Sequence, residues 1–510
     1  MDKVSHLERD ASVALATIRE WENTFIPTGR IPSDILFHIS THLSSQDDRL
    51  RASSVCRHWR RTLLQCAELW SELYLSRGET YTKTLLERAK GHLLDVIVHQ
   101  GVPAGTMNLL SSHMKQIRCL NFAEWQGIQK FSEITSEPLP LLHALTINVV
   151  EKPLDDDSTL PPQPLLNNAV NLEVFRLHSE SFLSPSPSLN QFFFPNLVSF
   201  DFSTRPWEFH SRQLLDFLEA SPMLRTVHMK IIVNRFFQDR FFHNTPEEKI
   251  IVLPNVENFN LTVSDYTDGY QFATYISCPS ALHTTITYDT SNEDFNPVAI
   301  FPPRDLMDLI VRQYTRSTAE EAILETTTIL GTITSAITFR SSDATAIKFG
   351  FTTISSDRKY EEGVRYQAFI QAARRIEDHP WANIKRLSIC HGLHPCNASD
   401  IAGSVERLFK SLGPLDELTI YRCDIQPFFP SFLNMPDITP VTFPPITNLT
   451  ICNPTSSDSQ CTASIVWLAK SHHALGMPLE RVIFRAKEIP QGIEEEVRPW
   501  VGSFEYYYDE

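Results

Sequence analysis

A short apolar pattern recurs along most of the chain, and it constrains the fold more than any other feature. The pattern is apolar-x-x-apolar-x-apolar, and its copies form two groups, one up to Leu261 and one from Ile384. Within each group, successive copies begin about 24 to 33 residues apart, within the period of solenoid repeats. Its last two apolar residues alternate like the inward face of a β-strand. The copies are Leu93, Val96, Val98; Ile117, Leu120, Phe122; Leu142, Leu145, Ile147; Leu172, Phe175, Leu177; Leu197, Phe200, Phe202; Leu224, Val227, Met229; Val256, Phe259, Leu261; Ile384, Leu387, Ile389; Leu415, Leu418, Ile420; Ile446, Leu449, Ile451; and Leu479, Val482, Phe484.

Several copies follow an amphipathic helix and a turn. Each unit is therefore predicted to contain a helix, a tight turn and a short strand, and parallel stacking of such units predicts a curved α/β solenoid. The helix positions are Leu214, Leu215, Phe217 and Leu218 before Ser221-Pro222; Val405, Leu408 and Leu412 before Gly413-Pro414; and Ile465, Trp467 and Leu468 before Met477-Pro478.

Residues 30–76 have a different pattern, which predicts three short helices. Pro32 suits a first helical position, with Ser33 and Asp34 in the first turn. The second helix is expected to be capped by Asp47 and Asp48. A third helix is expected around Ala67 to Leu73. The apolar positions are Leu36, Ile39 and Leu43 in the first helix, Ala52, Cys56, Trp59 and Leu63 in the second, and Leu69 and Trp70 in the third. About forty residues bury too little surface to be robust alone, so several of these side chains should contact another molecule.

The ordered combination Ile31-Pro32-Ser33-Asp34-Ile35-Leu36, Val55-Cys56-Arg57-His58-Trp59-Arg60 and Leu69-Trp70 resembles an F-box. It departs from the family pattern in Ile31 for Leu, Asp34 for Glu, and a turn lengthened by residues 46–49. The resemblance implies docking to a Skp-family adaptor and, through it, to a cullin–RING scaffold. The adaptor contacts that it implies are Ile31, Pro32, Ile35, Leu36, Ile39, Leu43, Val55, Trp59, Leu69 and Trp70. The alternative is that Leu36, Cys56 and Trp59 form the core of a small helical bundle, and the two interpretations are compatible.

The repeated pattern looks like the degenerate leucine-rich repeats found in fungal F-box proteins. One copy completes the consensus, with Leu415, Leu418, Ile420, Cys423 and Ile425. Residues 289–379 fit worst, although residues 336–339 and 346–349 look like strands of unknown register. The alternative is a non-repeat α/β domain whose strands resemble one another.

These patterns predict an α/β chain with four parts. They are an N-terminal helix at 1–29, an F-box at 30–76, an irregular leucine-rich-repeat-like solenoid at 77–500, and an acidic tail at 501–510. Proline-rich stretches at Pro153 to Pro164, Ser184 to Ser188 and Pro427 to Pro445 are expected to be surface loops.

Charge and composition narrow the class of partner. The formal net charge is −16, which argues against a nucleic-acid or anionic-membrane surface. The exception is a set of arginines around the second predicted helix, Arg49, Arg51, Arg57, Arg60 and Arg61, which form either a surface complementary to an acidic adaptor or a solvated helix face. The nine cysteines form no regular framework, and no long apolar run is present. We therefore expect a cytoplasmic or nuclear protein.

A search for catalytic chemistry finds no recognisable motif, so we expect neither an enzyme nor a cofactor. Cys390, His391, His394 and Cys396 are compressed around Gly392 and Pro395, which favours a metal-free loop over a zinc site. Asp155, Asp156 and Asp157 are expected to form a solvated turn. Trp467 is expected in a helix core, and His472 and His473 at an exposed helix end.

The favoured function is a substrate receptor that docks to the adaptor through its F-box and holds a target protein on its repeats. The alternatives are a binding scaffold without ubiquitylation, or an enzyme with an unrecognised site. The target is expected on outward strand positions, namely Arg176, His178, Asp201, His228, Lys230, Asn260, Thr262, Thr419, Tyr421 and Arg422.

Overall fold

A computed structural model of the chain contains two compact units, Met1–Leu197 and Val198–Glu510. The structure describes residues 2–23, 25–43, 45–75, 78–99, 101–125, 139–149, 169–179, 194–204, 211–231, 250–263, 272–289, 319–329, 332–341, 346–354, 384–391, 407–421, 444–454, 458–487, 490 and 492–508. Most of the predicted proline-rich loops, together with Asp155 to Asp157, Val405, Cys423 and Ile425, lie outside these residues.

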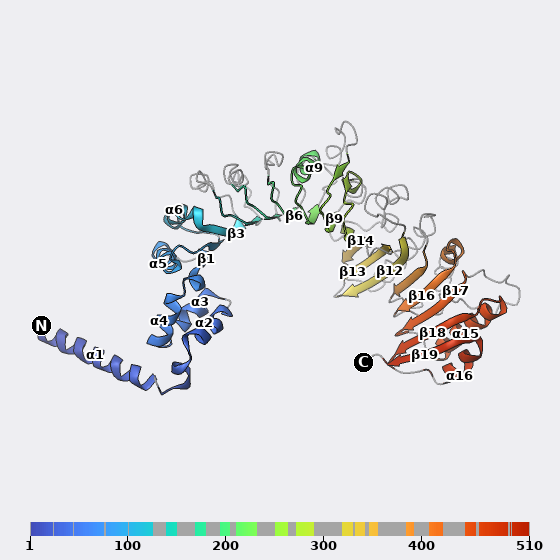
Figure 1. Ribbon diagram of the computed structural model, residues 1–510, viewed down its shortest axis with the longest axis horizontal. Coiled ribbons are helices and arrows are strands. Elements are labelled where there is room, and N and C mark those ends of the chain that lie inside the picture. The colour runs from blue at the N-terminus through green and yellow to red at the C-terminus, as the bar shows by residue number, and fades with distance from the viewer. Residues whose placement is uncertain are drawn as a thin grey trace. The chain divides into compact units, whose positions relative to one another are not determined.

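The first unit contains an N-terminal group of helices followed by a parallel sheet (Figure 1). Its elements are α1 (Asp2–Asn23), η1 (Pro27–Arg30), α2 (Ser33–Thr41), α3 (Gln46–Ala52), α4 (Arg57–Gln65), η2 (Ala67–Trp70), β1 (Glu72–Leu75), α5 (Glu79–Ala89), β2 (Leu94–Val98), α6 (Ala104–Ser111), η3 (Met114–Gln116), β3 (Ile117–Trp125), β4 (Ala144–Val149) and β5 (Val174–Ser179). Strands β1 to β5 pair in sequence order, and all four pairings are parallel.

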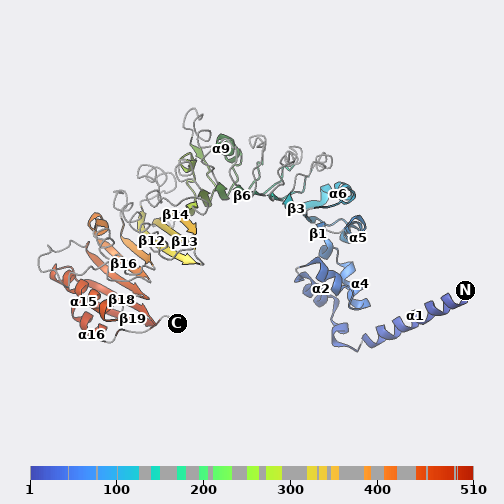
Figure 2. The same ribbon diagram turned by 180° about the vertical axis from the view of Figure 1, so that it is seen from behind.

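The second unit contains a longer sheet with a few helices. Its elements are β6 (Ser199–Thr204), α9 (Ser211–Glu219), β7 (Thr226–Ile231), β8 (Ile251–Val252), β9 (Asn258–Val263), β10 (Ile276–Ser277), β11 (His283–Asp289), β12 (Ala319–Ile329), β13 (Thr332–Ser341), β14 (Ala346–Ile354), β15 (Arg386–His391), β16 (Leu415–Tyr421), β17 (Ile446–Cys452), α15 (Asp458–Ala474), β18 (Leu479–Ala486), α16 (Ile493–Val497), η8 (Arg498–Trp500) and β19 (Val501–Tyr508). Figure 2 shows α15 and α16 on the same side of β18 and β19.

The apolar pattern coincides with the strand register in both units. Leu120 lies opposite Leu145, which lies opposite Phe175. A longer row in the second unit joins Leu387, Leu418, Leu449, Val482 and Phe504. Because equivalent positions of successive copies are neighbours, their side chains form continuous rows. The named residues are buried except Phe504 at the end of its row, which is half-buried.

Every residue of the predicted copies is buried except Leu93, which is 41% exposed. The neighbouring Leu94 is buried instead and lies opposite Ile117. The prediction is therefore wrong by one residue at the first position of this copy, while Val96 and Val98 lie opposite Leu120 and Phe122 as the pattern predicts. The reason is a register shift between Leu94 and Asp95, where β3 has one more residue than β2.

β13 lies in the stretch 289–379, for which no register was predicted, and it is antiparallel to both β12 and β14. Only two residues separate β12 from β13, and a link that short joins antiparallel strands, whereas a parallel crossover needs a dozen residues or more. β14 pairs with β11, and β12 pairs with β15. The three strands therefore lie in reverse order within the sheet. The strands predicted at 336–339 and 346–349 are confirmed.

The acidic tail predicted at 501–510 is wrong for residues 501–508, which form β19. This strand pairs in parallel with β18, and Arg481 on β18 donates two hydrogen bonds to Glu505, of 2.8 and 2.5 Å. The alternation of Phe504 and Tyr506 with polar residues is the strand signal that the acidic composition obscured. Strand β1, which contains Leu73, likewise replaces the end of the predicted third helix.

Asparagine side-chain amides link neighbouring copies of the apolar pattern, at the turns that precede the strands. The side-chain N–H groups of Asn171, Asn196 and Asn255 donate to the carbonyl oxygens of Pro140, Val170 and Pro222, at 2.7, 3.2 and 3.0 Å. Each Asn immediately precedes the first apolar residue of its own copy. Each acceptor lies two residues before the first apolar residue of the neighbouring copy. These bonds satisfy turn carbonyls that the strand pairing leaves free. These asparagines are not part of the predicted apolar pattern.

Among the described helices, none combines the length and the apolar character that a bilayer crossing requires.

Gly502 is predicted to be essential for the pairing of β19 with β18. A Cβ atom at this position would lie 2.6 Å from the backbone oxygen of Glu480, which belongs to the paired strand. Gly502→Ala should therefore lower the free energy of unfolding by about 1–3 kcal/mol, measured by denaturant unfolding. The control is Gly105→Ala, whose Cβ would meet only the flexible Glu79 side chain. Equal effects of the two variants would contradict this explanation.

His472 is predicted to make the second unit acid-sensitive. The expected exposed helix end is wrong for this residue, which is buried, while His473 is exposed. Burial lowers the pKa of His472 below 6.5. Its Nδ1 lies 3.3 Å from the Met477 oxygen, and its Nε2 has no partner among the described residues.

Because burial favours the neutral imidazole, the free energy of unfolding should have its full value above about pH 6.5, the ordinary pKa of histidine. It should fall below that pH with a slope of up to about 1.4 kcal/mol per pH unit. His472→Asn should flatten this slope in thermal melts recorded between pH 7.5 and 5. His473→Asn, the neighbouring exposed histidine, should leave it unchanged. An unaltered slope in His472→Asn would show that another group is responsible.

Candidate functional site

We call residues 31–70 the module. They contain the three α-helices α2, α3 and α4 and the short helix η2. The boundaries of the three α-helices differ from the prediction. The single helix expected from Asp47 to Leu63 is wrong, because α3 ends at Ala52 and α4 begins at Arg57. The hydroxyls of Ser53 and Ser54 both donate to the Leu50 carbonyl and so compete with continuation of the helix. The N-cap is Ser45, whose Oγ accepts from the Asp48 N–H at 3.1 Å, in place of the expected Asp47 and Asp48.

Helix α2 has a buried face and an exposed apolar face. Pro32 occupies its N-cap, one position before the predicted one. Leu36 and Ser40 are buried against the module, with the Ser40 hydroxyl bonded to the Leu36 carbonyl. Ile35 and Ile39 are 49% and 40% exposed. Because residues four apart lie on one side of a helix, these two isoleucines form a single exposed apolar face.

Helix α4 fixes the segment that leads into α2. The indole N–H of Trp59 donates to the Thr28 carbonyl at 2.8 Å, and Nε2 of His58 lies 2.9 Å from the Ile31 carbonyl. The half-buried Trp59 therefore holds the turn before α2 in addition to its predicted role. These bonds determine where Ile31 and Pro32 lie.

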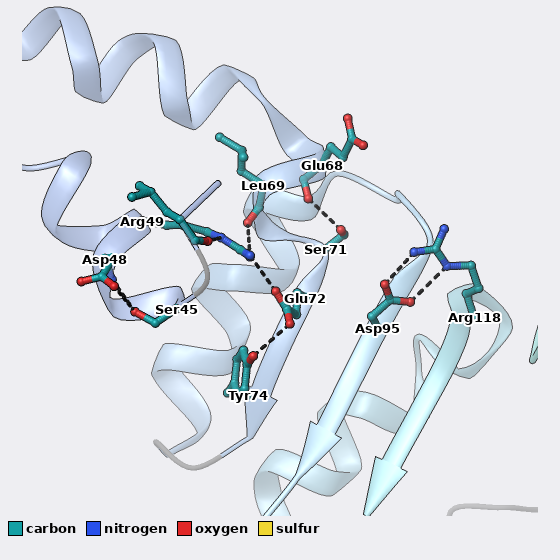
Figure 3. Close-up of polar contacts among 11 residues, drawn as sticks. Ser45, Asp48, Arg49, Glu68, Leu69, Ser71, Glu72, Tyr74, Asp95 and Arg118 are labelled. Atoms are coloured by element: carbon teal, nitrogen blue, oxygen red, sulfur yellow. Dashed lines mark hydrogen bonds and ion pairs between the residues drawn. The ribbon is translucent and has the colours of Figure 1, made fainter. Parts of the chain in front are cut away.

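Arg49 joins the module to the first strand of the sheet (Figure 3). Its guanidinium donates to the Leu43 and Leu69 carbonyls, each at 3.1 Å, and to the Glu72 carboxylate at 2.7 Å. The Tyr74 hydroxyl donates to the same carboxylate at 2.9 Å. Only 12% of the Arg49 side chain is exposed. Arg49 therefore binds groups of its own chain and is largely buried. It does not belong to the arginine surface predicted around the second helix.

Three of the predicted adaptor contacts lie in the core of the module. Leu36, Leu69 and Trp70 are buried. The Trp70 indole N–H donates to the Leu63 carbonyl at 2.9 Å, and the Arg88 guanidinium from α5 lies 4.7 Å from its ring. These side chains complete the core, so the free module does not present them to a partner.

The remaining predicted contacts are accessible. Pro32, Ile35, Ile39 and Val55 are exposed, and we name them the exposed apolar set. Val55, 57% exposed, lies between α3 and α4. Ile31, Leu43 and Trp59 are half-buried. Several large apolar residues exposed on one small module are typical of a protein-binding site.

The predicted outward residues fall in two separate groups. Arg176 and His178 lie on β5 in the first unit, exposed and half-buried respectively. In the second unit, Asp201, His228 and Asn260 are direct neighbours on β6, β7 and β9. The structure thus brings these three together in one polar row.

The other outward residues of the second unit have local partners or lie apart. Lys230 forms a 2.9 Å ion pair with Asp289 on β11, and Thr262 is its neighbour on β9. Thr419 donates to Glu417 at 3.2 Å on β16, a strand that also carries the half-buried Tyr421. Arg422 lies outside the described residues.

The described residues contain no group of three or more metal-ligating side chains. Cys390 and His391 end β15, and His394 and Cys396 lie outside the described part of the chain. Burial raises the pKa of the Cys119 thiol to about 11 and raises that of Cys278 as well, so both thiols are protonated at neutral pH. A protonated thiol is a poor nucleophile.

Part of the chain matches a known family model. Residues 28–76, which run from within η1 through β1 and include the exposed apolar set, match the model of the F-box-like family, whose domains generally bind Skp-family adaptors. The chain matches no curated protein.

Proposed function

We propose that the chain is the substrate-recognition subunit of an SCF-type ubiquitin ligase. The main support is the exposed apolar set on a module whose core is already closed by Leu36, Leu69 and Trp70. Its F-box-like domain would dock to the Skp-family adaptor and through it to a cullin–RING scaffold. The chain would act by holding a target near the transfer machinery, without catalytic residues of its own, in the cytoplasm or nucleus.

Docking would bury apolar side chains that water now surrounds. Complete burial of an exposed Ile or Val side chain contributes about 1.5–3 kcal/mol. Ile35, Ile39 and Val55 are 49%, 40% and 57% exposed, so covering each would contribute roughly half of that range, and together they could anchor an interface. Ile31, Leu43 and Trp59 would lie at its margin, since each is already partly covered within the module.

The substitutions Ile35→Asp and Ile39→Asp test this docking. Each places a charge in the proposed contact, and each is expected to weaken adaptor binding at least about tenfold, or 1.4 kcal/mol, the range of interface hot spots. The measurement is calorimetric titration of the full chain with the purified adaptor. Both side chains are exposed, so the thermal midpoint should change little.

The matched control is Leu93→Asp, because Leu93 is 41% exposed, close to the 40% of Ile39, and lies outside the module. This variant should bind the adaptor like the wild type. Normal binding by both isoleucine variants would refute docking through α2.

We further infer that the copies of the apolar pattern form a leucine-rich-repeat-like solenoid, and that this solenoid binds the target. The in-register rows of apolar residues and the Asn amides between units support this inference. The polar row of Asp201, His228 and Asn260 is then a candidate target surface, because side chains on three neighbouring strands are about 4.8 Å apart and can contact one partner together.

The double substitution His228→Ala with Asn260→Ala tests the polar row. It should reduce the yield of target proteins that co-purify with the full chain from proteasome-inhibited cells at least about tenfold, while adaptor recovery stays the same. The control is Met223→Ser, an exposed residue before β7. Quantitative mass spectrometry gives both yields, and an unchanged set of co-purified proteins would exclude this row as the target surface.

A reconstituted ubiquitylation assay separates the receptor from a scaffold. A receptor should promote modification of the co-purified target only when the adaptor, the cullin–RING scaffold and intact Ile35 and Ile39 are all present. A scaffold would bind the target without promoting its modification.

A further inference from the structure

The N-terminal helix α1 carries an apolar stripe with the spacing of a coiled coil. The spacing in α1 is three, four and three residues between Ala11, Ala14, Ile18 and Trp21. In the sequence, Leu7 and Val4 continue it upstream, and Phe25 continues it just beyond the end of the helix at Asn23. This alternation averages 3.5 residues, the repeat that keeps one seam of a helix facing a second helix. A stripe that follows the core of a globular domain has a wider period, near 3.6.

The stripe is exposed. Ile18 and Trp21 are 53% and 65% exposed, and every described side chain of α1 except the half-buried Ala16 is exposed. The Trp21 ring packs edge to face against the ring of Phe25 in the turn after α1, with centroids 4.8 Å apart. Trp21 therefore has one aromatic contact within its own chain and still leaves most of its side chain exposed.

The charges favour a second copy of the same helix over a membrane. Residues 2–25 contain three Lys or Arg and five Asp or Glu residues, whereas helices that bind anionic membranes carry a basic polar face. With Ile18 at heptad position a, Lys3 falls at position g and Glu8 at the following position e. In a parallel pair of identical helices, g of one helix lies opposite e of the other. The sequence thus has opposite charges where a parallel homodimer brings them together.

We propose that α1 is a dimerisation helix, which joins two copies of this chain in a short parallel coiled coil. Ala11 and Ala14 allow close approach of the helices at the centre of the seam, while Ile18 and Trp21 supply most of the apolar contact among the described residues. The pairing needs neither the adaptor nor a target, so it does not rest on the proposed function.

The test is the mass of the purified full chain by light scattering after size-exclusion chromatography, across a range of concentrations. The mass should rise with concentration from 58.3 kDa toward twice that value. Ile18→Asp should keep it at 58.3 kDa. The matched control is Val13→Asp, which introduces the same residue into the same helix at an exposed position outside the seam and should dimerise like the wild type.

A charge exchange tests the parallel orientation. Lys3→Glu should weaken the dimer because it brings like charges together, and adding Glu8→Lys should restore it. A wild-type mass of 58.3 kDa at every concentration would overturn the proposal, as would equal behaviour of Ile18→Asp and Val13→Asp. Loss of dimer in Lys3→Glu without rescue by Glu8→Lys would overturn the parallel arrangement. Flotation of a monomeric wild-type chain with anionic vesicles would assign the stripe to a membrane instead.

Discussion

The closure of the module's core around Trp70 is the interaction on which the functional interpretation depends. Three short helices bury too little surface to be stable alone, and the core is completed by side chains that follow them. Trp70 bonds to the Leu63 carbonyl and lies under Arg88 of α5, while Arg49 bonds to both Leu69 and Glu72. Leu36, Leu69 and Trp70 are buried in this core, whereas Ile35 and Ile39 of α2 are exposed and so are accessible for the proposed docking.

The strand positions could be predicted well because their cause is local and repeated. Two apolar residues separated by one polar residue, after a turn, are enough to specify a strand with one buried face. The predictions failed, or stayed open, where the strand register or the strand direction has a cause other than the apolar spacing. A register shift between β2 and β3 places Leu94 instead of Leu93 in the buried row, and the short link between β12 and β13 reverses the direction of β13. Neither effect appears in the apolar spacing.

The candidate site could be predicted only in part for a similar reason. A motif gives the order of residues along the chain, but burial decides which of them face outward, and Leu36 and Ile35 differ by only one position. The same holds for His472 and His473, of which one is buried and one is exposed. Among the proposed target residues, strand pairing brings Asp201, His228 and Asn260 together. The sequence shows that these three positions are polar, but it does not show the strand register that makes them neighbours.

Hydrogen–deuterium exchange of the full chain with and without the Skp-family adaptor tests the central claim most directly, because it reads the site of contact residue by residue. If the exposed apolar set docks to the adaptor, the adaptor should slow exchange in residues 31–41 and around Val55, and leave β16 to β18 unaffected. Complex formation with unchanged exchange in residues 31–41 would contradict it.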